Sequence, residues 1–120
     1  MSKTHVLTID GWHPARLNQW DGRHWTARAR LKRSDREIVA LYARLAAMPP
    51  ATGKRRVSLR LTLEPRQRGG DPDAYFKSVL DALVHAGLLQ DDNRQGAELG
   101  EVTFARGPKR RTEIVLEDVS

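Results

Sequence analysis

The sequence contains no cysteine among its 120 residues. Disulfides, thiolate zinc sites and cysteine nucleophiles are therefore excluded, and their absence fits a reducing compartment. No stretch approaches the roughly 18 apolar residues of a membrane span, and the first residues lack the apolar run of a signal peptide. We expect a cytoplasmic protein without a membrane partner, folded as one domain over residues 1–120.

Acidic residues are few outside one segment of the chain. Residues 69–101 hold seven acids and two bases, a net charge of −5, while the remainder holds nineteen bases and eight acids, a net charge of +11. So basic a surface attracts polyanions such as nucleic acid. Carboxylates beside a phosphate backbone repel it unless they hold Mg²⁺ or Mn²⁺, which can activate water against a phosphodiester. The charge pattern therefore predicts a metal-dependent nuclease.

The periodicity of apolar residues predicts an α/β (α+β) domain in which two main helices pack on a mixed sheet. The expected order is β-α-β-α-β-β, with strands at about 3–9, 55–64, 101–106 and 111–117. The last two strands, joined by a turn at Gly107-Pro108, are expected to pair in antiparallel fashion. The first helix ends before Pro49-Pro50, and its start is open between Thr26 and the capping-box pattern of Ser34 with Glu37.

The second helix has a complete set of boundary signals. Asp71 suits the N-cap, Pro72 suits the first helical position, and Gly87 suits the stop. Asp71 and Asp73 therefore lie at the helix end whose free amides and positive dipole stabilise negative charge.

The second pair of acids, Asp91 and Asp92, follows this helix in a loop that could fold back beside the helix start. Together with Asp71 and Asp73 it would form an oxygen cage for one or two Mg²⁺ ions. The alternative interpretation is structural, because Asp-Pro is an ordinary helix start and Asp-Asp-Asn is an ordinary turn. Only the tertiary fold separates the two interpretations.

Lys77 lies four residues after Asp73 and four before Asp81, on one stripe of the helix. It could form an ion-pair ladder with these acids, or it could reach a scissile phosphate and stabilise the charge that develops there. Asp81 is then a partner that orients Lys77, or a surface residue.

Basic and aromatic residues precede the acidic segment. The loop at about 11–25 carries Trp12, Trp20 and Trp25 beside Arg23, a mixture that could stack bases and hold phosphates, or could anchor the loop to the core or to a partner subunit. The basic cluster that includes Arg28 at the start of the first helix is a DNA contact or a solvated face.

Several of these residues together resemble the RusA family of Holliday-junction resolvases. The resemblance is carried by Asp71-Pro72-Asp73, Lys77, Leu80-Asp81-Ala82-Leu83, Ala86-Gly87 and Asp91-Asp92. It covers several residue types over about twenty positions and is therefore specific.

The resemblance implies a small homodimer, encoded by a bacterium or a phage, that binds four-way DNA junctions and makes paired symmetric nicks in DNA recombination and repair. It implies Mg²⁺, or Mn²⁺, held by Asp71, Asp73 and Asp92, with Asp91 as a further candidate ligand. By the same resemblance, Lys77 would assist at the phosphate.

The chain departs from the family pattern at two places. Ala74 stands where the family has Asn after the second Asp, and Gly69-Gly70 replace basic residues before the first. Arg66 and Arg68 are then the candidate phosphate contacts. Two other functions stay open: a non-catalytic accessory protein that binds branched DNA, and a small interaction protein whose basic charge serves solubility.

Overall fold

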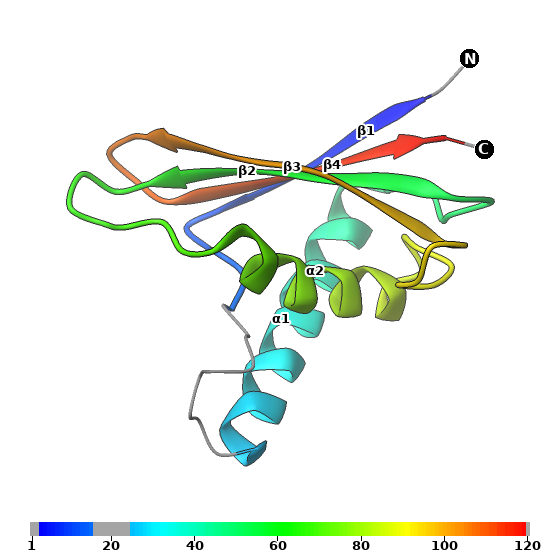
Figure 1. Ribbon diagram of the computed structural model, residues 1–120, viewed down its shortest axis with the longest axis horizontal. Coiled ribbons are helices and arrows are strands. Elements are labelled where there is room, and N and C mark those ends of the chain that lie inside the picture. Colours follow the sequence, from blue (N-terminus) through cyan, green and yellow to red (C-terminus); the bar gives the residue numbers. More distant parts are fainter. Residues whose placement is uncertain (1–2, 16–24, 120) are drawn as a thin grey trace.

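The computed structural model describes residues 3–15 and 25–119, with backbone alone for 25–28. In these residues the elements follow the order β1 (Thr4–Asp10), α1 (Trp25–Leu45), β2 (Arg55–Leu63), α2 (Pro72–His85), β3 (Ala97–Arg106) and β4 (Arg111–Asp118). The strands form one mixed sheet, and both helices cover the same face of it (Figure 1). The single α+β domain with a mixed sheet and two helices is confirmed.

The strands lie in the spatial order β1-β4-β2-β3. β4 pairs in antiparallel fashion with both β1 and β2, whereas β3 pairs with β2 in parallel. The predicted antiparallel pairing of the last two strands is therefore wrong, because β2 lies between them. β2, α2 and β3 instead form a βαβ unit, the arrangement that a helical crossover between parallel strands requires.

The connection between β3 and β4 crosses the end of β2. The Gly107 amide donates to the Leu63 carbonyl at 3.0 Å, an ordinary length for a backbone hydrogen bond. A Cβ at Gly107 would meet the Thr62 methyl at 2.9 Å, so glycine permits this close crossing. The Gly107-Pro108 signal marks a real turn, but the turn joins strands that are not neighbours.

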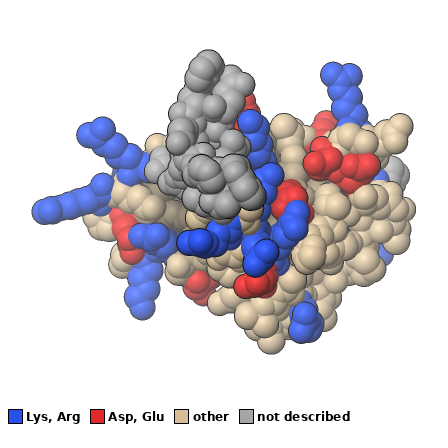
Figure 2. Space-filling model, turned by 90° about the horizontal axis from the view of Figure 1, so that it is seen from below, with Lys and Arg blue, Asp and Glu red and all other residues tan. Residues whose placement is uncertain are grey.

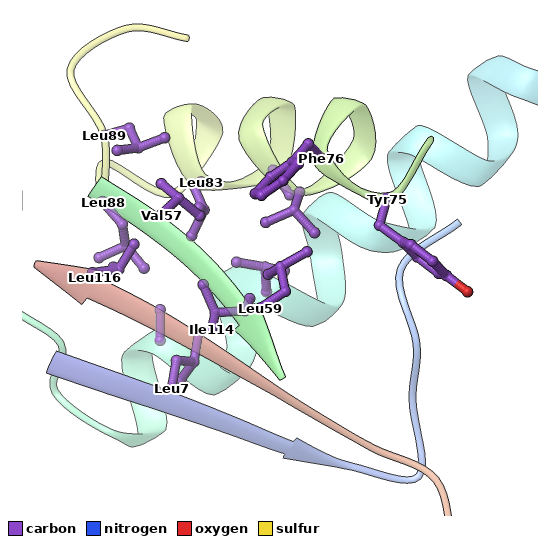
Figure 3. Close-up of a cluster of buried hydrophobic side chains, with 14 of the residues drawn as sticks. Leu7, Val57, Leu59, Tyr75, Phe76, Leu83, Leu88, Leu89, Ile114 and Leu116 are labelled. Carbon is purple, nitrogen blue, oxygen red and sulfur yellow. The ribbon is translucent and has the colours of Figure 1, made fainter. Parts of the chain in front are cut away.

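The core lies between the sheet and the helices. β2 alternates as predicted, with Val57, Leu59 and Leu61 buried. Figure 3 shows side chains of β1, β2 and β4 converging with those of α2 and with Leu88 and Leu89 after it. Because α2 supplies much of the core, its position on the sheet is fixed by apolar burial.

The two helices settle the boundary questions differently. α1 begins at Trp25, so Ser34 lies inside the helix and the later start is wrong. α2 follows its predicted signals, with Asp71 as N-cap, Pro72 at the first position and Gly87 beyond the end at a φ of 78°. No helix in the described part of the chain is long and apolar enough to cross a membrane.

Candidate functional site

Asp71 and Asp73 lie together at the N-terminal end of α2. The Asp71 carboxylate accepts a hydrogen bond from the Asp73 amide at 3.1 Å, and the Ala74 amide donates to the Asp71 carbonyl at 3.0 Å. Both carboxylates are exposed. The cap thus fixes the backbone of this pair while leaving carboxylate oxygens open to solvent.

Lys77 and Asp81 do not form the ion-pair ladder with each other. Both oxygens of Asp81 accept from Arg36 of α1, at 2.7 Å from Nε and 2.9 Å from Nη2. These hydrogen bonds hold the pKa of Asp81 below its ordinary value. Asp81 therefore joins the two helices and does not orient Lys77, whose ammonium is exposed and has no partner among the described residues.

Asp91 and Asp92 lie in a tightly built loop between α2 and β3. Asp91 accepts from the Asp92 amide at 2.7 Å and from the Asn93 side-chain amide at 3.1 Å. A Cβ at Gly96 would clash with the Asp91 backbone, so the loop closes on a glycine. Asp91 is thereby used inside the loop, whereas the exposed Asp92 carboxylate has no hydrogen bond within the described chain.

A buried arginine holds this loop in place. Arg55 is 2% exposed and donates to the Leu88 carbonyl at 3.0 Å, to the Pro49 carbonyl at 3.1 Å and to the Asp118 carboxylate at 2.7 Å. The bonds from Arg55 also hold the pKa of Asp118 below its ordinary value. This role was not predicted from the sequence, although Arg55 alternates in register with the inward-facing Val57 and Leu59.

The two pairs of acids lie at opposite ends of α2 (Figure 1). Asp71 follows the C-terminal end of β2, whereas Asp92 precedes the N-terminal end of β3, and these strands run parallel. The 14-residue helix between them is about 20 Å long at 1.5 Å per residue. Consequently the loop does not fold back to the helix start, and the described residues contain no group of three His or acidic side chains that could hold a metal ion within one subunit.

The predicted DNA contacts differ in how well they are placed. Arg66 and Arg68 are exposed on the loop 64–70, directly before Asp71. Lys and Arg side chains project at the left-hand end of the helical face in Figure 2, the end at which this loop lies in Figure 1. Arg23 and the side chain of Arg28 lie outside what the structure describes.

The loop 64–70 is braced by neighbouring side chains. Arg106 donates to the carbonyls of Glu64, at 3.0 Å, and of Gln67. His13 Nε2 bonds the Thr62 carbonyl at 2.7 Å, so this nitrogen carries the proton, and Nδ1 accepts from Gln67 Nε2 at 3.1 Å. Burial lowers the pKa of His13, which favours this neutral form. The basic loop is therefore held in one position.

A buried carboxylate joins α1 to α2. Asp35 is 5% exposed, accepts from the Ala15 amide at 2.8 Å and bonds the Ser78 hydroxyl. Burial raises its pKa despite these bonds. The pair was not predicted from the sequence, although Asp35 lies on the apolar stripe between Leu31 and Val39, where a charged residue indicates a buried partner.

The tryptophans of the predicted loop are placed in part. Trp12 is half-buried against the hydrophobic core, which agrees with the anchoring interpretation. Trp20 and the side chain of Trp25 lie outside the described residues, so base stacking by them stays a prediction.

Comparison with known proteins assigns no family. No family model matches the chain, and no curated protein matches its sequence. Among solved structures, it is similar to thiamine monophosphate kinase from Aquifex aeolicus, at 12% identity and a TM-score of 0.44. The match covers 99% of this chain but 33% of that one, so this chain spans a third of the kinase chain. A similarity this weak carries no argument about function.

Proposed function

We propose that the protein is a metal-dependent endodeoxyribonuclease that cuts four-way DNA junctions in the cytoplasm by paired symmetric nicks. The observation that carries the proposal is the exposed pair Asp71 and Asp73, which the α2 N-cap holds directly after a basic loop. Their carboxylates have no cationic partner among the described residues. Hard oxygen ligands beside a phosphate-binding loop fit Mg²⁺ or Mn²⁺.

A complete site requires a second subunit. Because α2 separates Asp71 and Asp73 from Asp92, one chain offers two incomplete halves. In a homodimer that places the α2 start of one protomer against the loop 88–96 of its partner, the two halves would meet twice. A two-fold dimer then presents one site to each of two equivalent strands of a junction.

The candidate residues would have two roles, metal binding and stabilisation of the phosphate. Asp71, Asp73 and Asp92 would hold the metal, which when bound acts as a Lewis acid and lowers the pKa of a water molecule. Asp92 is favoured over Asp91, whose two oxygens already accept hydrogen bonds within the loop. Lys77, one turn after Asp73, would stabilise the charge on the phosphate as the bond to the 3′-oxygen breaks. Products would carry 5′-phosphate and 3′-hydroxyl ends.

The first experiment is cleavage of a labelled four-way junction beside a linear duplex of the same sequence, with Mg²⁺, Mn²⁺ or EDTA. Symmetric nicks at the junction that require metal are expected. Binding without any cut under either metal would contradict the nuclease proposal.

Mixing two inactive variants tests the shared site. Asp73→Asn and Asp92→Asn subunits, each inactive alone, would form mixed dimers that contain one intact site of two. Half of randomly mixed dimers are of this kind, and each of them has half of the wild-type number of sites. About a quarter of the wild-type rate should therefore return. No recovery in a mixture verified to exchange subunits would show that the halves do not combine across the dimer.

The second candidate is a non-catalytic protein that binds branched DNA. Ala74 favours it, because this residue is buried beneath the acidic pair and offers no amide to orient the carboxylates. Asp71→Asn keeps the helix cap and so separates the candidates. A nuclease loses cleavage and keeps binding, whereas a binding protein changes in neither.

A further inference from the structure

A cavity of about 540 Å³ opens beside the basic loop 64–70. Its walls come from five parts of the chain: the segment after β1, helix α1, the loop 64–70 itself, the start of α2 and the turn between β3 and β4. Cavities of 300–1,000 Å³ are the usual size for small-molecule and cofactor sites. Gln67 and Arg68 of the loop that leads into Asp71 line the cavity, whereas Asp71 and Asp73 themselves do not.

One side of the cavity is cationic. It is lined by Arg68 and Arg110, and none of the described residues that line it is acidic. Arg68 has no partner among the described residues. Arg110 donates one hydrogen bond, from Nη2 to the Glu64 carboxylate at 3.0 Å. Arginine guanidinium groups retain further donors in a fork that matches phosphate oxygens.

The other side is apolar and fixed in place. Pro14, Ala15 and Leu31 line it, together with Tyr75. The Tyr75 hydroxyl accepts from the Gly70 amide at 2.9 Å, which leaves its own proton for a ligand. The Ala15 backbone is held by Asp35, so this wall does not depend on exposed side chains.

The polar groups between these sides are already oriented. His13 is neutral, and both of its ring nitrogens are occupied by Thr62 and Gln67. The Gln67 side-chain oxygen accepts from the Glu64 amide at 3.1 Å, and its nitrogen donates one N–H to His13 and keeps a second N–H without a partner among the described residues. The site thus offers a neutral donor between a cationic end and an apolar end.

We propose that this cavity binds one nucleotide unit, with its phosphate at Arg68 and Arg110 and its base against Pro14, Leu31 and Tyr75. The inference rests on the proposed function in one respect: a nuclease that acts on branched DNA supplies such a unit as a nucleotide displaced from the stack at the branch point. A free nucleotide has the same chemistry, and the experiment separates these two sources.

The test uses two probes on the full-length protein in EDTA, so that cleavage plays no part. Free dAMP and inorganic phosphate are titrated by calorimetry, and a junction with 2-aminopurine at the branch point reports unstacking by fluorescence. Ala15→Leu fills the cavity without changing charge, and Arg110→Gln removes one cation. Ala46→Leu and Lys109→Gln are matched controls on exposed positions that do not line the cavity.

We expect wild-type protein and both controls to bind dAMP more tightly than phosphate and to raise the 2-aminopurine signal. Arg110→Gln should weaken dAMP binding about tenfold, the effect of losing one charge-assisted hydrogen bond, and Ala15→Leu should abolish it. Loss of dAMP binding in Ala15→Leu with no 2-aminopurine response in wild type would assign the cavity to free nucleotides.

Equal responses from Ala15→Leu, Arg110→Gln and the controls would overturn the proposal, as would binding of phosphate as tight as that of dAMP. These outcomes are independent of cleavage. A protein that binds dAMP here but never cuts a junction would refute the nuclease proposal alone, and a junction nuclease without nucleotide binding here would refute the cavity proposal alone.

Discussion

The two ends of α2 differ from its middle in how their acids are used. Asp73 and Asp92, at the ends, are exposed and have no side-chain partner in the described chain. Asp81 in the middle is bound by Arg36, and Ser78 in the middle bonds the buried Asp35. The fold thus uses the central polar groups to join its helices and leaves the terminal acids without a charged partner among the described residues.

The largest effect is expected on the rate of junction cleavage, which should depend on the terminal acids and not on the central Asp81. Asp73→Asn and Asp92→Asn should each lower the rate of junction cleavage by ~100-fold or more, as loss of an electrostatic catalytic group does, with little change in melting temperature. Asp81→Asn, the matched control, should lower the melting temperature and leave cleavage near the wild-type rate. Comparable loss of cleavage in all three variants would show that the terminal acids have no role that the central Asp81 lacks.

The next effect concerns the anchor of the loop that carries Asp92. Arg55→Met should reduce the free energy of unfolding by about 2–4 kcal/mol, because it leaves buried carbonyl oxygens without donors. Urea denaturation measures the loss. Arg56→Met, at the half-exposed neighbour, is the control and should cost far less. An equal cost for both variants would remove Arg55 as the anchor.

A smaller effect follows from the helix-joining pair. Arg36→Met should cost about 0.5–1 kcal/mol, since both partners of its ion pair are partly exposed. The pKa of Asp81 is lowered in the folded state, so this stabilisation is present above its ordinary pKa and is lost as pH falls through the folded value. Melting curves of wild type and Arg36→Met should therefore converge at strongly acidic pH. A constant difference down to that pH would indicate a packing effect instead.

The smallest effect is expected at His13. Its pKa is lowered by burial, so its contribution to stability is present above the ordinary value of about 6.5 and is lost as pH falls through the folded value. His13→Gln should flatten the decline in melting temperature between about pH 7 and pH 5. His5→Gln, on β1 beside Asp118 at 3.6 Å, serves as a comparison. An unchanged slope in His13→Gln would exclude His13 as the group that titrates.

Local signals in the sequence predicted the elements well because each depends on neighbouring residues. The Asp71-Pro72 start of α2 and the Gly87 stop are set by capping and backbone geometry within one turn. The alternation of Val57, Leu59 and Leu61 gave the inward face of β2. The start of α1 was ambiguous because the Ser34 capping-box pattern is also compatible with a helix interior.

Strand pairing and the assembly of the acids were beyond local signals. The Gly107-Pro108 turn predicts where the chain reverses, but it does not say which strands pair. In the folded protein β2 pairs with β4 on one edge and with β3 on the other. Likewise, the spacing of Asp71, Asp73 and Asp92 in the sequence says nothing about the direction of β3. A parallel β3 must start at the end of the sheet opposite to the end of β2, and this places the loop away from the helix start.

The boundaries of α2, its acidic N-terminus, the basic background and the α+β class all follow from local properties of the chain, namely composition, capping and periodicity. Other features depend on the tertiary fold. Asp81 binds Arg36 and not Lys77, and Arg55 is buried beneath the acidic loop. Asp73 and Asp92 lie at opposite ends of α2. These facts depend on contacts between residues far apart in the chain, which are fixed when apolar faces pack together.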